Sequence, residues 1–286
     1  MANLKEIRSR IASVSSTMQI TSAMKMVSAA KLKKAQDAIT AMRPYANKLT
    51  ELLQNLSASL DSEAGGQYAE EREVKKVLIV AITSNRGLCG AFNSNIIKHC
   101  ISLTKTEYEG ASVEMMTIGK KGNDLLSKSF SIAGNHSDIY DHLTFENAAS
   151  IAEELMKAFT EGKYDKIILV YNRFKNAATQ IVTTEQFLPI LPAEGADQSG
   201  ADYLFEPTQE DIVTQLIPKS LKTQLFKGIR DSFASEHGAR MTAMHKATDN
   251  ASELKDQLTL TYKQARQAAI TNEILEIVGG AEALNH

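Results

Sequence analysis

Residues 4–18, LKEIRSRIASVSSTM, decide the expected fold because their apolar side chains recur at alternating intervals of three and four. This heptad spacing is typical of a coiled-coil helix, and its members are Leu4, Ile7, Ile11, Val14 and Met18. Asn3 can cap the helix, and Glu6 three residues later resembles a capping box. The spacing therefore predicts a long helix over residues 1–60 that packs along a partner helix.

The apolar series lapses near Thr21 to Ser28 in the sequence pattern. It resumes three residues out of phase, which would change the supercoil locally, at Ala35, Ala38, Met42, Tyr45, Leu49, Leu52 and Leu56. Pro44 lies inside the second series and predicts a bend or a junction. We expect the helix to end in the loop 61–71, which contains Gly65 and Gly66.

The other end of the chain repeats this pattern over residues 208–280. Thr208 caps the expected helix, and Pro218 predicts a break or kink near its start. Spacings of three and four then recur at Met244, Ala247, Ala251, Leu254 and Leu258, and Ala265 rejoins the same phase. Gly279 and Gly280 are expected to stop the helix. The simplest assembly pairs the two terminal helices as an antiparallel coiled coil, with their small alanines close together.

Residues 72–192, between these helices, have the pattern of an α/β domain. Apolar runs of strand length occur at 77–82, 113–118, 167–171 and 180–190, and helical segments occur at 94–105, 121–128 and 145–160. Strands that alternate with helices predict a mainly parallel, Rossmann-like sheet. The fold class is thus α/β with long terminal helices.

Composition and charge exclude several classes of protein. The net charge of −2 does not indicate nucleic acid or an anionic membrane as a partner of the whole chain. Residues 1–60 nevertheless hold nine basic and three acidic residues, which predicts a local acidic partner. Cys89 and Cys100 match no metal-binding spacing and are expected to be reduced thiols. No apolar run approaches the length of a membrane span, and the first residues lack the apolar core of a signal peptide.

Catalytic and nucleotide-binding patterns are also missing from the sequence. The turn SNRGLCG, residues 84–90, follows a buried strand and precedes a helix. It is not GxGxxG, and no Gly-Lys-Ser/Thr follows it, so a tight turn with interface packing is the better interpretation. The six histidines are scattered and form no HExxH motif. We therefore expect no catalytic site, no cofactor and no metal.

Five strings in the sequence carry a family resemblance. They are KEIRSRIASV, ITSAMKMVSAAKLKKAQ, SNRGLCGAFN, ARMTAMHKATDN and YKQARQAAITNEILEIVGGAEAL. Together they resemble the gamma subunits of bacterial F-type ATP synthases, over nearly the whole chain. The family fold, two long terminal helices around a Rossmann-like domain, agrees with the fold predicted from periodicity.

The resemblance implies a non-catalytic rotor shaft. One end would stand inside a ring of three alpha and three beta subunits, and the other end would sit on the membrane ring of c subunits beside epsilon. Proton flow would turn the ring and the shaft, which drives the beta sites through their conformations in turn. The protein would be peripheral, on the cytoplasmic face of the bacterial inner membrane. The absence of cysteine from residues 190–206 argues against the thiol control of chloroplast members.

The resemblance also assigns contact residues. Met24 and Lys25 match positions that meet an acidic lever loop of beta, although a solvated basic face is the general alternative. A beta catch loop would contact Arg240, Arg266, Gln267, Thr271 and Glu273, which could otherwise be merely exposed. Tyr203 and Glu206 match a segment that meets the c ring and epsilon, or form an ordinary loop.

Two other classes of protein remain open from the sequence. An α/β enzyme using the SNRGLCG turn would need a ligand pocket with convergent polar groups. An α/β protein with a free-standing coiled-coil scaffold role would function alone, whereas a rotor subunit would purify with alpha and beta.

Overall fold

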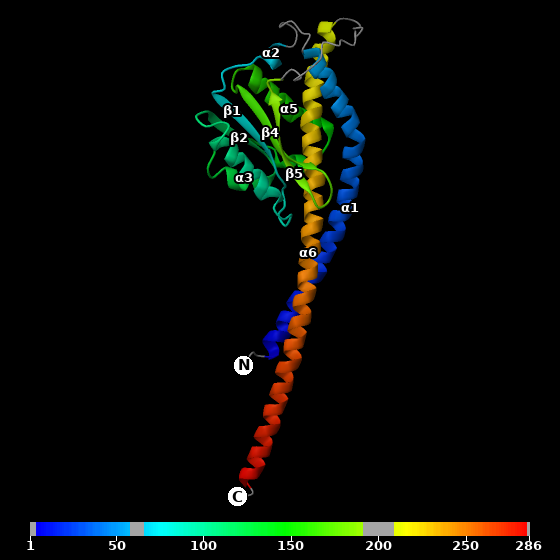
Figure 1. Ribbon diagram of the computed structural model, residues 1–286, viewed down its shortest axis with the longest axis vertical. Coiled ribbons are helices and arrows are strands. Elements are labelled where there is room, and N and C mark those ends of the chain that lie inside the picture. The colour runs from blue at the N-terminus through cyan, green and yellow to red at the C-terminus, as the bar shows by residue number, and fades with distance from the viewer. Residues whose placement is uncertain (1–3, 58–65, 191–208, 285–286) are drawn as a thin grey trace. The chain divides into compact units, whose positions relative to one another are not determined.

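The computed structural model describes residues 4–57, 66–190 and 209–284. Two long helices dominate it: α1 (Leu4–Ser57) and α6 (Gln209–Leu284) (Figure 1). The chain divides into two compact units, residues 1–28 with 241–286, and residues 29–240. No helix among the described residues is long and apolar enough to span a membrane.

The helical unit pairs the beginning of α1 with the later part of α6 in opposite directions, as the sequence predicts. Arg8 Nη2 donates a hydrogen bond to the Tyr262 hydroxyl at 2.7 Å. Thr248 Oγ1 donates to Thr21 Oγ1 at 2.9 Å, so residues further along α1 meet residues earlier in α6. These two contacts fix the antiparallel register of the pair.

The predicted lapse in the α1 seam is wrong. Thr21 and Ser28 are buried and Lys25 is half-buried, so the seam continues in phase through small and polar residues. The same three-and-four spacing leads on to the buried residues Leu32, Ala35, Ile39, Ala46 and Leu49. Tyr45, expected in the seam, is 50% exposed, and Leu254 of α6 is 46% exposed. Which residues of α1 are buried depends on their position around the helix. The apolar character of the residues alone gives the wrong positions for the seam.

Neither proline ends its helix, and the expected stop at Gly279 and Gly280 is wrong, whereas a bend at Pro44 and a kink at Pro218 stay predictions. Pro44 lies inside α1 and Pro218 inside α6, and both helices continue through them. Gly279 and Gly280 do not stop α6, which extends to Leu284. A glycine inside a helix costs only about 1 kcal/mol relative to alanine. The residues that follow, Ala-Glu-Ala-Leu, are good helix formers that can carry the helix past this cost.

The second unit contains a five-stranded sheet of order β3-β2-β1-β4-β5. Its strands are β1 (Lys76–Ile82), β2 (Ser112–Ile118), β3 (Ile132–Asn135), β4 (Lys166–Phe174) and β5 (Gln180–Leu188). The first four pair in parallel, and β5 pairs antiparallel with β4 at the edge. The sequence predicts four of these strands, but the four-residue β3 is too short to stand out.

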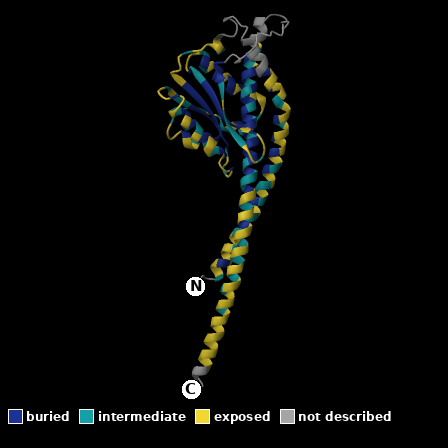
Figure 2. Ribbon diagram, in the orientation of Figure 1, coloured by how far each residue is buried: buried dark blue, intermediate teal, exposed yellow. Residues whose placement is uncertain are grey.

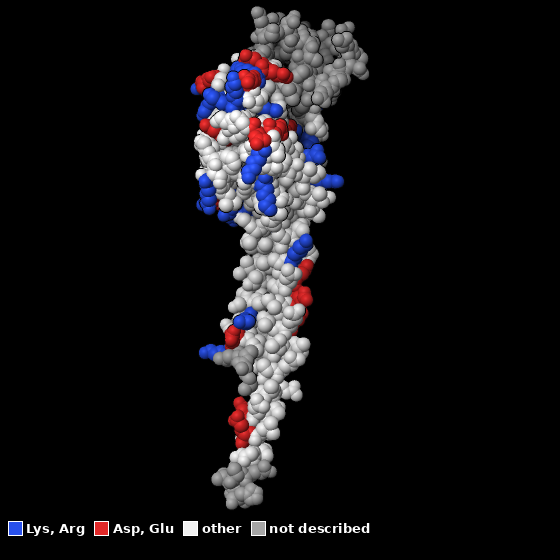
Figure 3. Space-filling view, turned by 60° about the vertical axis from the view of Figure 1, so that its left-hand side comes forward, with Lys and Arg blue, Asp and Glu red and all other residues white. Residues whose placement is uncertain are grey.

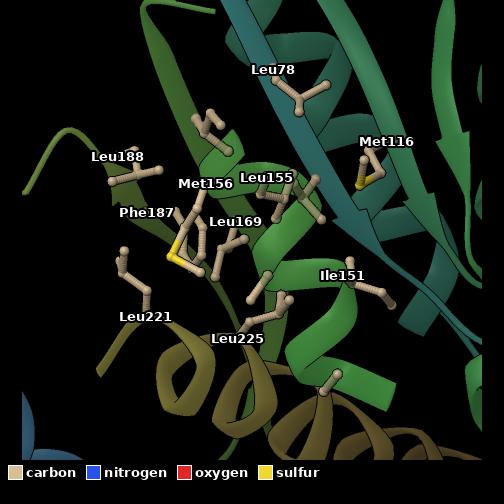
Figure 4. Close-up of a cluster of buried hydrophobic side chains, with 14 of the residues drawn as sticks. Leu78, Met116, Ile151, Leu155, Met156, Leu169, Phe187, Leu188, Leu221 and Leu225 are labelled. Carbon is tan, nitrogen blue, oxygen red and sulfur yellow. The ribbon is translucent and has the colours of Figure 1, made fainter. Parts of the chain in front are cut away.

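Helices cover both faces of this sheet, giving the expected α/β layers. The connecting helices are α2 (Gly66–Ala69), α3 (Phe92–Lys105), α4 (Lys120–Leu126), the short 3-10 helix η1 (Ser137–Tyr140) and α5 (Phe145–Thr160). One face packs against α5 and α6, through residues such as Leu155, Leu169, Phe187 and Leu225 (Figure 4). The other face packs against α3 and α4, through residues such as Ile79, Ile96 and Leu126. The central strands are almost wholly buried (Figure 2).

Candidate functional site

The turn after β1 is held by its own side chains. The Asn93 side-chain oxygen accepts a hydrogen bond from the Ser84 backbone N–H at 2.9 Å, and Ser84 Oγ donates to the Arg86 carbonyl at 2.7 Å. Leu88 and Gly90 both adopt the left-handed backbone conformation, each with φ of 60°. These features fold residues 84–90 into a compact loop at the carboxyl end of β1.

Arg240 of α6 clamps this turn. Its Nη2 atom donates to the carbonyl oxygens of Arg86 at 2.9 Å and Gly87 at 3.2 Å, and its Nε atom donates to Gly87 at 3.3 Å. Its Nη1 atom binds Glu236 Oε1 at 2.6 Å. Arg240 is only 7% exposed. The guanidinium therefore joins α6 to the turn within this chain.

The clamp lies where an open α/β sheet ordinarily binds ligands. In such sheets the ligand crevice lies at the carboxyl ends of two neighbouring strands whose following connections go to opposite sides of the sheet. In this sheet those two strands are β1 and β4. Phosphate binding at such a turn requires backbone N–H groups that point at the ligand. Here the carbonyl groups of Arg86 and Gly87 face the Arg240 cation instead. This geometry disfavours a nucleotide site at the turn.

Burial controls the ionisation of the groups around Arg240. Burial raises the pKa of Glu236, and the Arg240 charge opposes that shift. Burial, with further contributions from Arg240 and Lys31, lowers the pKa of His237 to about 4. His237 is 6% exposed and packs edge-on against the Phe233 ring. The clamp thus places the Arg240–Glu236 salt bridge beside an imidazole that is neutral at neutral pH.

The last part of α6 has no partner strand or helix among the described residues. The hydrogen bond between Arg8 and Tyr262 sets the register, and in this register Leu4, where α1 begins, lies near Arg266. Figure 1 shows α6 continuing beyond the end of α1, and Figure 2 shows this stretch exposed. Large apolar side chains on it are 45–71% exposed, namely Ile270, Ile274, Leu275, Ile277 and Val278.

Exposed apolar residues gathered on one helix mark an interaction surface. We call these five residues the apolar end of α6. Their sequence pattern alone does not distinguish them from seam residues, because their exposure depends on the absence of a facing helix among the described residues.

Comparison with known proteins decides the family. A family model described as ATP synthase matches residues 3–284. The ATP synthase gamma chain of Flavobacterium johnsoniae is 73% identical over the full length of both chains. The chain belongs to the ATP synthase gamma-chain family. A more distant gamma chain, from a Geobacter species, is 44% identical over 99% of each chain.

Solved structures agree with this fold. A chain of the Euglena gracilis mitochondrial ATP synthase, in a structure of OSCP, F1 and the c ring, aligns with a TM-score of 0.71. It is 21% identical and covers 98% of this chain and 94% of its own. A chain from the central stalk and c ring of Tetrahymena thermophila ATP synthase aligns with a TM-score of 0.57 at 27% identity. That alignment covers 80% of this chain and 99% of the other.

The predicted gamma-chain contact residues fall in different environments. Met24 and Lys25 are half-buried on α1, and Lys25 occupies a seam position. On α6, Arg266, Gln267, Thr271 and Glu273 are exposed beside the apolar end. Their roles stay predictions. Arg240, by contrast, is buried and donates to Arg86, Gly87 and Glu236 within the chain, and its contact with beta also stays a prediction. Tyr203 and Glu206 lie outside the described residues.

Features of an enzyme site are weak in the described part of the chain. No group of three or more His, Cys, Asp or Glu could hold a metal ion there. A hollow of about 440 Å³ is lined by His136, His142, Asp138, Asp141 and Glu154 among others. The hollow is open, and in it His136 Nε2 lies 3.2 Å from Glu154 Oε2. Both cysteines are buried and free, and burial raises the pKa of each thiol.

Proposed function

We propose that this gamma chain is the non-catalytic rotor of a bacterial ATP synthase, at the cytoplasmic face of the inner membrane. Its partners would be the alpha and beta subunits, epsilon and the c ring. Related solved structures are described as a rotor or as a central stalk with the c ring, which supports this role. No cofactor or metal is proposed for the chain.

One observation carries the proposal: α6 extends as a single helix whose exposed end is apolar. Five large apolar side chains in water are unfavourable unless another surface covers them in the assembly. A sleeve formed by the ring of alpha and beta subunits would supply that cover. An apolar end also suits rotation, because apolar contacts are non-directional and do not fix one angle.

The coupling between rotation and catalysis needs asymmetric contacts. A rotor biases a partner's conformation only by the difference in its interaction free energy with the alternative conformers. The exposed polar residues Arg266, Gln267, Thr271 and Glu273 lie beside the apolar end and could supply such contacts. On α1, Met24 and Lys25 are proposed to meet an acidic loop of beta. The interspersed charges on the face in Figure 3 give no reason to propose nucleic acid.

The proposal is tested by purification from membranes. A tagged copy of the chain is expressed in its source cell, and the complex is solubilised and purified by the tag. We expect alpha, beta, epsilon and c subunits in stoichiometric amounts. A chain that purifies alone, or with unrelated proteins, would instead favour the scaffold role. Binding of ATP to the isolated chain in calorimetry, abolished by Arg86→Ala, would contradict the non-catalytic assignment.

Met24→Lys tests the proposed contact on α1. The new ammonium would pair with the acidic loop and deepen one angular position, and each 1.4 kcal/mol slows escape about tenfold. We expect assembly and ATP hydrolysis to persist while proton pumping per ATP falls. Met26→Lys, at a 63% exposed position two residues away, is the control of the same chemistry. If both variants pump the same number of protons per ATP hydrolysed, Met24 does not contact the acidic loop of beta.

A further inference from the structure

A hollow of about 630 Å³ lies at the β4–β5 side of the sheet, within residues 29–240. Four elements form its wall: α1, β4, β5 and α6. Its volume falls within the range of about 300–1,000 Å³ typical of small-molecule sites. The ionisable side chains that line it are four cations and two carboxylates: Arg43, Arg173, Lys175, Lys227, Glu185 and Asp231. The lining therefore has an excess of two positive charges.

Both carboxylates of the hollow already have partners on neighbouring elements. Asp231 Oδ1 lies 2.5 Å from Arg43 Nη2, and Glu185 Oε1 lies 3.2 Å from Lys227 Nζ. Glu185 Oε2 also accepts a hydrogen bond from the Tyr171 hydroxyl at 2.7 Å. These contacts balance two of the four cations and hold the Arg43 and Lys227 side chains at the hollow. The excess charge therefore belongs to the other two cations.

Those two cations are Arg173 and Lys175. Both are exposed, and neither forms an ion pair with a carboxylate within the described ranges of the chain. Alternate side chains of a strand share a face, so Arg173 lies on the same face as Tyr171, whose ring lies against Gly228 of α6. Burial raises the pKa of the Tyr171 hydroxyl, and the nearby Arg173 charge opposes that rise. The Arg173 guanidinium is thus placed at the hollow, with its charge uncompensated there.

Arg43 adds donors from the opposite wall, on α1. Its Nη2 atom alone makes the two described bonds, to Asp231 and to the Phe174 carbonyl oxygen. A guanidinium has five N–H donors in a planar fork. The Arg43 side chain is 36% exposed, so its remaining donors are accessible to a solute. Asp231 holds this side chain in place before any anion arrives.

We propose that this hollow binds a phosphate group, held by Arg43 of α1 and by Arg173 and Lys175 at the end of β4. A phosphate group carries a charge of about −1.5 to −2 at pH 7, which matches the excess charge of the lining. Guanidinium groups bind phosphate through two parallel hydrogen bonds. The carboxylates of an acidic peptide would instead bring single charges on separate side chains. The bound anion would connect α1 to the sheet.

The test uses the isolated full chain, so it does not depend on assembly with other subunits. Sodium phosphate is titrated into the chain in a calorimeter, in sodium chloride of matched ionic strength. We expect one phosphate per chain. At a free phosphate concentration ten times the dissociation constant, the unfolding midpoint should rise by roughly 3–6 °C relative to chloride alone.

Three variants locate the site. Arg173→Ala should weaken phosphate binding roughly tenfold, as expected for the loss of one charge-assisted hydrogen bond, and Lys175→Ala should weaken it about threefold or more. Lys98→Ala is the matched control, because Lys98 is an exposed lysine on α3, which covers the other face of the sheet. It should bind phosphate as the parent does. Without phosphate, all three unfolding midpoints should stay within about 2 °C of the parent.

The source of the phosphate group follows from a second titration, with ADP. ADP binding that is tighter than phosphate binding, and is weakened by Arg173→Ala but not by Arg86→Ala, would assign the hollow to a nucleotide's phosphate chain. Binding of phosphate without ADP would assign it to the free anion.

Two results would overturn the proposal. One is the absence of saturable phosphate binding, or an equal loss of binding in Lys98→Ala and Lys175→Ala, which would indicate charge screening alone. The other is an Arg173→Ala chain that no longer assembles with its partners while the parent binds no phosphate. That result would assign these cations to an acidic segment of another subunit.

Discussion

Arg43 of α1 connects that helix to α6 and to β4 within the α/β unit, because it binds the Asp231 carboxylate and the Phe174 carbonyl oxygen. Its Nη2 atom lies 2.5 Å from Asp231 Oδ1 of α6 and 2.7 Å from the Phe174 carbonyl oxygen at the end of β4. Asp231 also accepts the Phe174 backbone N–H at 3.3 Å. The Asp231 side chain is 2% exposed, so it depends on these partners for the stabilisation that water would give. Arg43→Ala removes the only cation that pairs directly with it among the described residues.

The expected cost is large for a single substitution. Breaking a buried ion pair by removing one partner costs about 3–5 kcal/mol. The Arg43 side chain is 36% exposed, so water can enter after truncation, and we expect the lower end, about 3 kcal/mol. For a domain of this size that corresponds to a fall in the unfolding midpoint of roughly 6–12 °C.

The pH dependence of this loss has a definite sign. Burial raises the pKa of Asp231 above its ordinary 3.8, and Arg43 opposes that shift. Without Arg43 the pKa rises further, so between 3.8 and the raised value the folded state binds more protons than the unfolded state. The free energy of unfolding then falls as pH rises through that window. The variant should therefore lose more stability at neutral pH than in mild acid.

Urea unfolding followed by far-ultraviolet circular dichroism measures the effect. Arg10→Ala is the control: it also breaks an Arg–carboxylate pair, at 2.7 Å, but both side chains are more than half exposed. We expect it to cost under about 0.5 kcal/mol. Adding Asp231→Asn to Arg43→Ala should recover part of the loss by removing the orphaned charge. Equal costs for Arg43→Ala and Arg10→Ala would refute the reasoning.

Three further predictions concern other parts of the fold. Acidification from pH 6.5 to about 4 should lower the free energy of unfolding by up to about 3 kcal/mol through His237, because its imidazole binds a proton in the unfolded state but stays neutral in the folded state. The difference between the pH–stability curves of the parent and of His237→Phe measures this contribution. Gly119→Ala should destabilise by about 3 kcal/mol in urea unfolding, since a Cβ there would lie 2.2 Å from the Thr83 carbonyl oxygen at a φ of 115°. Replacing Gly279 and Gly280 by alanine should stabilise the end of α6 by about 1 kcal/mol each, seen as slower amide hydrogen exchange, because both sites have open space for a Cβ.

Much of the fold could be predicted from the sequence because its signals are local. Heptad spacing predicted the antiparallel helix pair, and the run at 77–82 predicted the central strand. The polar seam residues Thr21 and Lys25 could not be recognised as seam positions by apolarity, since their burial depends on the facing helix. Gly279 predicts a helix stop, but the residues after it continue the helix to Leu284.

The site was less predictable than the fold. Nothing local indicates that Arg240 turns inward, because the carbonyl groups that it binds lie 153 and 154 residues away in the chain. The strain at Leu88 is equally invisible in sequence, because a neighbouring glycine would be the expected residue to adopt positive φ. The sequence drew attention to the turn and to Arg240 separately, and the hydrogen bonds between them are visible only in the structure.

The antiparallel helix pair has a consequence for the order in which the chain folds. Thr21 meets Thr248, and Arg8 meets Tyr262, so these contacts close over 227 and 254 residues. Ribosomes add about 5–20 residues per second, so Thr248 is synthesised roughly 11–45 s after Thr21. The sheet and its helices can be complete by then, whereas the first turns of α1 still lack a partner. Their exposed seam is a natural target for chaperones, and newly made chains should be most prone to aggregation in that interval.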